Sequence, residues 1–92
     1  MTERIKTLHP EGKKGVNIKK AKYDKMKKAI ISSLKGVESI SFKNLGQVVR
    51  ERLTKDFEGS IGWYYTTVKL DLEARGIIER VPNTRPQLLR LA

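Results

Sequence analysis

The chain has 92 residues, no cysteine and a net charge of +10, and 38% of its residues are hydrophobic. This length supports one small domain with a single core, and the absence of cysteine excludes a disulfide framework and thiolate chemistry. No apolar run approaches the roughly 18 residues of a membrane-spanning helix, and the polar start lacks the apolar stretch of a signal peptide. We therefore expect a cytoplasmic protein without a membrane partner.

The positive charge is concentrated at the N-terminal end. Residues 1–35 contain eleven Lys and Arg against three acids, whereas residues 36–92 contain nine against seven. Residues 1–18 show neither a helical nor a strand period, and two glycines flank Lys13 and Lys14, which predicts a flexible basic arm before a domain over residues 19–92. Such an arm is typical of a surface that neutralises the phosphates of nucleic acid, and a merely solvated tail is the alternative.

The first predicted helix covers residues 19–34. Its apolar residues fall on one stripe and its lysines on the opposite face, as in an amphipathic helix that packs on a core. The stripe consists of Tyr23, Met26, Ile30 and Leu34, and the polar face carries Lys22, Lys25, Lys28 and Ser32. Because the core needs this stripe, the pattern argues against a helix that lies on an anionic membrane.

A second helix is predicted after a short extended stretch at residues 39–42. Ser41 has the side chain to cap it, and Lys35-Gly36 ends the preceding helix. The inner face of the second helix consists of Phe42, Leu45, Val48, Val49 and Leu53.

The third predicted helix begins at Ser60, a capping residue, and stops at Gly76, which can adopt the left-handed conformation that ends a helix. Its inner stripe consists of Ile61, Tyr65, Val68 and Leu72. Residues 77–81 and 87–91 then have the pattern of two strands, and the intervening turn carries a proline at each end. The end of the chain is therefore predicted to be a β-hairpin.

The order helix, short strand, helix, helix, hairpin resembles the winged helix-turn-helix superfamily over residues 19–92. The resemblance is plainest in Leu72-Glu-Ala-Arg-Gly-Ile-Ile-Glu-Arg80, which is similar to the junction of recognition helix and wing in many bacterial repressors. It implies a mainly α fold with a small β-hairpin, a third helix that enters the major groove of double-stranded DNA, and a hairpin along the adjacent backbone. The chain also resembles small bacterial proteins without an assigned activity, which adds no chemistry.

The outer side of the third predicted helix is unusual for a helix that reads DNA. It carries Trp63, Thr66, Thr67, Leu70 and Ala74, with Lys69 and Glu73 beside them. No Arg, Asn or Gln stands there to make bidentate contacts with bases. Trp63, Leu70 and Ala74 instead form a second apolar stripe, which either packs under the arm or the first helix or forms an interface with a second copy or another protein.

The hairpin, the arm and the first helix are the expected contacts with nucleic acid. Arginines in the hairpin can reach phosphates or a narrow minor groove. Tyr64 can present its hydroxyl to a phosphate, whereas Tyr65 belongs to the core. Arg75 is expected to have a structural role, either by interacting with the helix dipole or by pairing with Asp71. The expected contact residues are Lys13, Lys14, Lys19, Lys20, Lys22, Lys25, Lys28, Tyr64, Thr66, Thr67, Lys69, Arg80, Arg85 and Arg90.

No motif points to catalysis, a metal or a cofactor. His9 is the single histidine, and Gly12-Lys-Lys-Gly15 lacks the spacing of a P-loop and is typical of a hinge. Asp71 and Glu73 lie two positions apart and therefore point to different sides of a helix. We expect a DNA-binding protein such as a transcriptional regulator, not an enzyme, that binds mainly through backbone electrostatics and has no identified small-molecule effector. The alternative is a winged-helix module for protein interaction or dimerisation.

Overall fold

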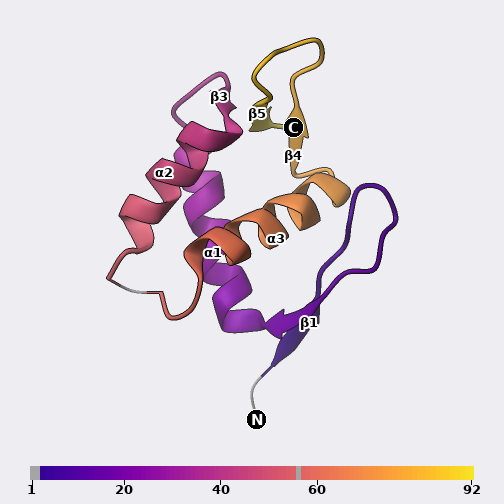
Figure 1. Ribbon diagram of the computed structural model, residues 1–92, viewed down its shortest axis with the longest axis vertical. Helices are drawn as coiled ribbons and strands as arrows, with labels where there is room; N and C mark the ends of the chain where they lie inside the picture. The colour runs from indigo at the N-terminus through magenta and orange to yellow at the C-terminus, as the bar shows by residue number, and fades with distance from the viewer. Residues whose placement is uncertain (1–2, 56) are drawn as a thin grey trace.

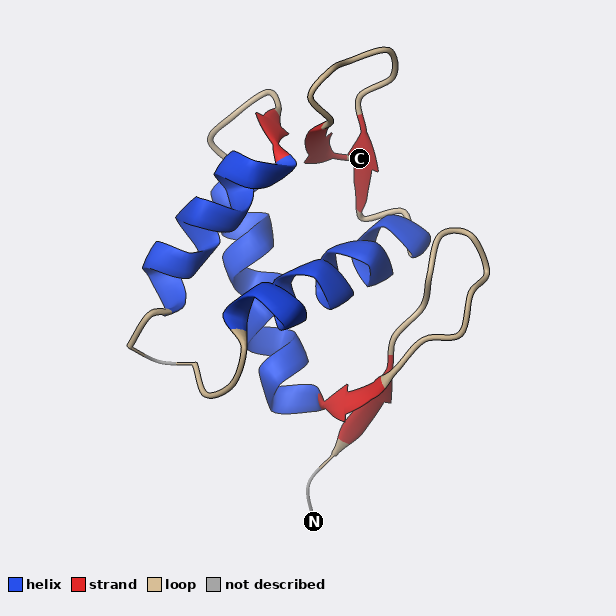
Figure 2. Ribbon diagram, in the orientation of Figure 1, coloured by secondary structure: helices blue, strands red, loops and turns tan. Residues whose placement is uncertain are grey.

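The computed structural model describes residues 3–55 and 57–92, and within this part of the chain three helices and two small antiparallel sheets form an α+β fold (Figures 1 and 2). The helices surround the core, and a sheet lies at each of two corners of the molecule. In chain order the elements are β1 (Arg4–Lys6), β2 (Asn17–Lys19), α1 (Lys20–Leu34), β3 (Ile40–Ser41), α2 (Phe42–Leu53), α3 (Ile61–Ala74), β4 (Ile78–Arg80) and β5 (Leu88–Leu91).

Helix α1 forms the back of the core and crosses behind α3 in Figure 1. It begins one residue later than predicted and ends at the predicted residue. The four residues of its predicted stripe are all buried, together with Ala29 and Ser33. Both α2 and α3 pack against this apolar side, so that the opposite, lysine-bearing side of α1 faces solvent.

Serine caps start the two following helices as predicted. The hydroxyl of Ser41 accepts a hydrogen bond from the Asn44 amide at 3.1 Å, and that of Ser60 accepts one from the Trp63 amide at 3.2 Å. Both bonds satisfy amide groups that have no partner inside the first turn of a helix. Helix α3 ends at Ala74, and Gly76, two residues later, has φ +74°; the amide of Ile77 donates to the Leu72 carbonyl at 2.9 Å. This is the Schellman arrangement, in which glycine avoids the steric cost of the left-handed conformation.

The C-terminal sheet has the strand order β3-β5-β4, and all of its pairs are antiparallel. Ile40 lies opposite Leu89, which in turn neighbours Arg80 of β4. The predicted hairpin is therefore confirmed, with shorter strands than expected. Leu89 and Ile78 are buried and connect this sheet to the helical core.

The N-terminal segment differs from the flexible, irregular arm that the sequence predicts. Strands β1 and β2 form an antiparallel hairpin in which Ile5 lies opposite Ile18, and the expected boundary after residue 18 falls inside β2. Ile18 is buried, and Gly15 lies so close to the Thr7 carbonyl that a Cβ atom there would overlap it. Each strand has three residues and turns one isoleucine inward, which is too short a pattern for a strand period to be recognised.

Replacing Leu72 with alanine should destabilise the protein by about 2 to 5 kcal/mol, because this side chain is fully buried in the core and its loss leaves a cavity. Urea unfolding followed by circular dichroism measures the change. Leu8→Ala is the control, since Leu8 is 46% exposed and should cost much less. A loss below about 1 kcal/mol for Leu72→Ala would contradict this account of the core.

Candidate nucleic-acid interface

A buried carboxylate fixes the N-terminal hairpin to the helices. Asp71 is completely buried in α3, and its oxygens accept hydrogen bonds from the Leu8 amide at 2.8 Å and from the Tyr23 hydroxyl of α1. Arg75, one turn further along α3, donates to the same carboxylate at 2.9 Å, which confirms the pair expected from the sequence. Asp71 therefore receives donors from the hairpin, α1 and α3.

The contacts with Asp71 raise the pKa of both side-chain donors, Tyr23 and Arg75. Burial raises the pKa of Tyr23 well above its usual range, and the hydrogen bond to Asp71 raises it further. The hydrogen bond to Asp71 also raises the pKa of Arg75. Both groups therefore keep their protons, and the buried carboxylate keeps its donors, throughout the neutral pH range.

The hairpin lies over part of the outer side of α3. A hollow of about 160 Å³ separates the two, and its lining includes Leu8 and Val16 from the hairpin and Trp63, Thr67 and Leu70 from α3. Leu70 is half-buried, whereas Trp63 at the edge remains 47% exposed. Of the two predicted environments for this stripe, packing under the N-terminal segment therefore applies to Leu70, and Trp63 keeps an exposed face. Ala74 is half-buried.

Lys69 is buried, whereas the sequence predicts it as an exposed contact with nucleic acid. It is 4% exposed, its ammonium lies 2.8 Å from a Glu73 oxygen, and the same group sits 5.0 Å from the centre of the Phe42 ring. It also donates to the Gln87 side chain at 3.2 Å. A cation held by a carboxylate, an amide and an aromatic face is neutralised within the fold and is poorly placed to bind a phosphate.

Two of the three hairpin arginines make ion pairs within the fold. Arg80 pairs with Glu73 at 3.1 Å, and Arg90 pairs with Glu79 at 2.7 Å across the two strands. Arg85 is exposed in the loop between β4 and β5, and no carboxylate pairs with it among the described residues. Of the predicted hairpin contacts, Arg85 is therefore the one best placed for a phosphate.

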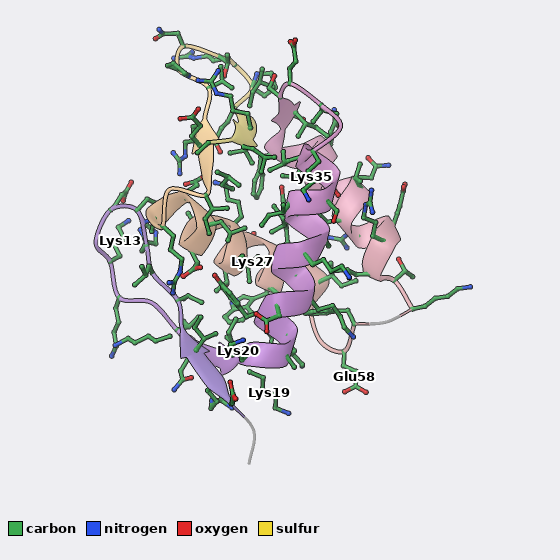
Figure 3. The ribbon with its side chains drawn as sticks, turned by 180° about the vertical axis from the view of Figure 1, so that it is seen from behind. Lys13, Lys19, Lys20, Lys27, Lys35 and Glu58 are labelled. Atoms are coloured by element: carbon green, nitrogen blue, oxygen red, sulfur yellow. The ribbon has the colours of Figure 1, made fainter. Side chains whose placement is uncertain are left out.

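Several N-terminal lysines lie on the side of α1 that faces away from α3. Figure 3 shows the molecule from behind, where α1 lies in front and Lys19, Lys20, Lys27 and Lys35 line its length. Two of the lysines in this region make exposed ion pairs, Lys20 with Asp24 at 2.9 Å and Lys13 with Glu11 at 3.1 Å. Lys19, Lys25 and Lys28 are also exposed, and Lys14 is exposed on the N-terminal hairpin, where it borders the hollow beside α3.

Lys22 and the aromatic start of α3 form a small cluster of their own. The Lys22 ammonium lies 5.1 Å from the centre of the Tyr64 ring, and Tyr64 packs edge-on against both Phe57 and Trp63.

The other predicted contacts on α3 differ in exposure. Tyr64 is half-buried, as is Thr67, whereas Thr66 is exposed. Tyr65 belongs to the core as predicted, and its hydroxyl donates to the Phe42 carbonyl at 2.6 Å.

A basic groove lies between α2 and α3, and the sequence analysis did not predict it. It holds about 340 Å³ and is lined on α2 by Lys43, Gly46, Gln47 and Arg50, and on α3 by Gly62, Tyr65 and Thr66. The signal was the polar face of α2, where Lys43, Gln47 and Arg50 recur at spacings of four and three residues. The groove continues past Thr66 into a second hollow of about 380 Å³ that reaches Pro86 and Gln87 before β5.

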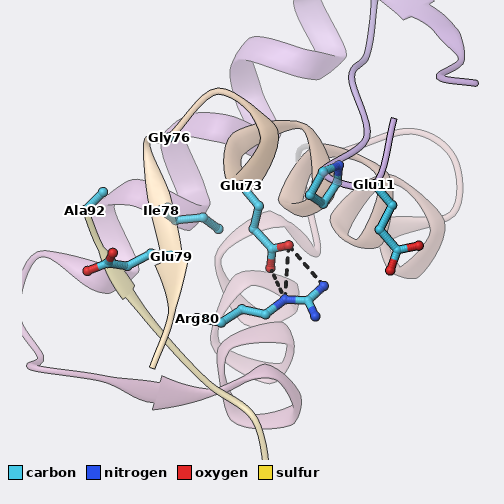
Figure 4. A pocket seen from close by; sticks show the side chains of 8 residues that line it. Glu11, Glu73, Gly76, Ile78, Glu79, Arg80 and Ala92 are labelled. Atoms are coloured by element: carbon cyan, nitrogen blue, oxygen red, sulfur yellow. Dashed lines mark hydrogen bonds and ion pairs between the residues drawn. The ribbon is translucent and has the colours of Figure 1, made fainter. Parts of the chain in front are cut away.

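A further hollow, beside β4, has the wrong charge for a phosphate. It holds about 450 Å³ between the N-terminal hairpin loop and β4, and Glu11, Glu73 and Glu79 line it together with Arg80 (Figure 4). The guanidinium of Arg80 is engaged by Glu73. Among the described residues no group of three His, Cys, Asp or Glu could hold a metal ion, so these carboxylates form no metal site either.

Comparison with known proteins places the chain in a family. A family model matches residues 4–89, from the first strand of the N-terminal hairpin to β5. The chain belongs to the DUF6958 family. This family is described as a family of unknown function, and no curated protein and no solved structure matches the chain significantly. In the described part of the chain, every helix is too short or too polar to cross a membrane.

Asp71→Asn should destabilise the protein by about 1 to 3 kcal/mol, because the amide cannot accept from all the donors that now face the carboxylate. The N-terminal hairpin should loosen first, so the Leu8 amide should exchange with solvent deuterium markedly faster than in the original protein. Asp24→Asn is the matched control, since it removes an exposed carboxylate and should leave this exchange unchanged. Unaltered protection of the Leu8 amide in Asp71→Asn would show that Asp71 does not hold the hairpin.

Proposed function

We propose that this protein is a winged-helix protein that binds double-stranded DNA mainly through electrostatic attraction. The order α1, β3, α2, α3, β4, β5 supports a winged-helix arrangement, with residues 81–87 as the loop of the wing. The sheet order β3-β5-β4 places the hairpin next to the short strand that precedes α2, which agrees with that arrangement. A transcriptional regulator is one role open to such a protein.

The lysine-rich side of α1 is the observation that carries the proposal. Residues 19–35 contain seven lysines and one acid, Asp24. The apolar side of α1 is buried, and five of the lysines are exposed, namely Lys19, Lys20, Lys25, Lys28 and Lys35. No carboxylate pairs with Lys19, Lys28 or Lys35 among the described residues. A surface of this kind binds a phosphate backbone by releasing its condensed counterions, which requires no particular base sequence.

An apolar cluster favours protein association as a second function. The exposed large hydrophobic residues of the described chain are Leu8, Val16, Val37 and Trp63, and Leu8, Val16 and Trp63 line one hollow beside α3. Exposed apolar residues that gather at one place are typical of a protein interface. Salt separates the two functions, because association through this cluster should persist at salt concentrations that release DNA.

Replacing Lys19, Lys28 and Lys35 together with alanine should weaken binding to unrelated duplexes by similar factors. The dependence of log affinity on log salt should become shallower by about 0.9 for each phosphate that the variant no longer neutralises. Fluorescence anisotropy with two labelled duplexes of different sequence, over a series of salt concentrations, measures both effects. Thr66→Ala removes no charge and should leave the slope unchanged.

Two outcomes would overturn the proposed function. If the original protein does not bind either duplex at low salt, the protein does not bind DNA and the association function is favoured. If the lysine variant keeps the original salt slope, the lysine side of α1 does not contact phosphates.

A further inference from the structure

The exposed residues of α2 and α3 differ in number and in chemistry. Throughout α3, which is described over its whole length, Trp63 and Thr66 alone are exposed. Helix α2 exposes half of its twelve residues, and all of these are polar or charged, namely Lys43, Asn44, Gln47, Arg50, Glu51 and Arg52. Given the proposed function, we infer that α2 makes the base-specific contacts with DNA and that α3 does not.

The side chains of α2 have the chemistry that base recognition requires. Arg and Lys make paired hydrogen bonds to guanine in the major groove, and Asn and Gln make paired hydrogen bonds to adenine. Lys43, Gln47 and Arg50 lie on one row of α2, so they can face the same groove of a duplex. From Lys43 to Arg50 the helix rises by about 10 Å, the length of about three stacked base pairs.

The packing between α2 and α3 leaves this row open. Gly46 lets the Tyr65 ring approach α2, since a Cβ at Gly46 would lie 2.8 Å from that ring. The Arg50 guanidinium reaches over Gly62, where it lies 3.4 Å from the position that a Cβ would occupy. The two glycines thus form a shallow floor beneath the row, and the side chains of Lys43, Gln47 and Arg50 stand at its rim.

The charge of this groove suits a nucleic acid. Lys43 and Arg50 border it, and among the described residues no carboxylate lines the groove or pairs with either cation. The neighbouring hollow adds Lys69, which Glu73 neutralises, and leads to Pro86, next to the exposed Arg85. The row on α2 and the tip of the wing therefore border one continuous surface.

The position of α3 explains why it is the poorer candidate. Figure 1 shows α3 across the middle of the molecule, with α2 on one side of it and the N-terminal hairpin on the other. The hydrogen bond from the Leu8 amide to Asp71 fixes the hairpin in that place. An α-helix with its side chains fills most of the width of a major groove, so a helix flanked on both sides cannot enter as deeply as α2 at the edge.

Selection from a pool of random duplexes, followed by sequencing, tests this inference. The original protein should enrich a preference that extends over about three adjacent base pairs and includes guanine. Arg50→Lys keeps the charge but removes the planar fork, and Gln47→Ala removes the amide; each should reduce the preference at one position by roughly 5- to 150-fold. Anisotropy with a duplex that lacks the preferred sequence should change by less than about 2-fold, because neither substitution alters the net charge.

Trp63→Ala is the matched variant on α3 and should keep the preference of the original protein. Thermal unfolding of the variants, followed by circular dichroism, establishes that all are folded. A preference that survives Arg50→Lys and Gln47→Ala but disappears in Trp63→Ala would assign base contacts to α3 and overturn the inference. Binding of all duplexes with equal affinity would overturn this inference alone, whereas no binding at low salt would overturn the proposed function as well.

Discussion

The arrangement of this protein depends on one buried carboxylate. Asp71 of α3 is completely buried in the fold. A carboxylate in such a place is costly unless several donors surround it. The Tyr23 hydroxyl, the Arg75 guanidinium and the Leu8 amide supply those donors from three parts of the chain. The hydrogen bond from Leu8 to this group and the burial of Ile18 in the core together hold the N-terminal hairpin against the helices.

A second acid distributes the charge of the molecule. Glu73 accepts Lys69 from within α3 and Arg80 from β4, and thereby neutralises two cations near the C-terminal hairpin. Exposed positive charge remains on the outer side of α1 (Figure 3), on the N-terminal hairpin, along α2 and in the loop between β4 and β5. We therefore separate two tasks in the proposed function: the lysines of α1 attract phosphates of any sequence, and the polar row of α2 distinguishes bases.

The helices and the C-terminal hairpin were predictable because each has a local signal. Ser41, Ser60 and Gly76 mark helix ends through backbone hydrogen bonds and a left-handed φ, and the apolar periods of the helices match their buried faces. The N-terminal hairpin was not predictable, since each strand has three residues and its docking rests on Asp71, a contact across 63 positions of the chain.

The candidate site was predictable only in part. The pairing of Arg75 with Asp71 follows from helical spacing, whereas the burial of Lys69 depends on Phe42 and Gln87, which lie far from it in the sequence. The polar face of α2 can be recognised in the sequence. The resemblance to DNA-binding winged helices, however, predicts that the third helix contacts the DNA. The number of exposed polar residues distinguishes α2 from α3 as a candidate for base contacts. This exposure depends on how the helices pack, and the spacing of residues in the sequence does not show it.

An NMR titration of the isotope-labelled protein with a short duplex shows directly whether the hairpin stays on α3 while DNA contacts other surfaces. Amide signals of residues 43–50 and of the outer side of α1 should then shift, together with the side-chain amide of Gln47. The Leu8 amide and the Trp63 indole should remain where they are in the free protein. Large shifts at Leu8 and Trp63, with residues 43–50 unaffected, would show that the hairpin leaves α3 and that α3 contacts the duplex, which would contradict the account.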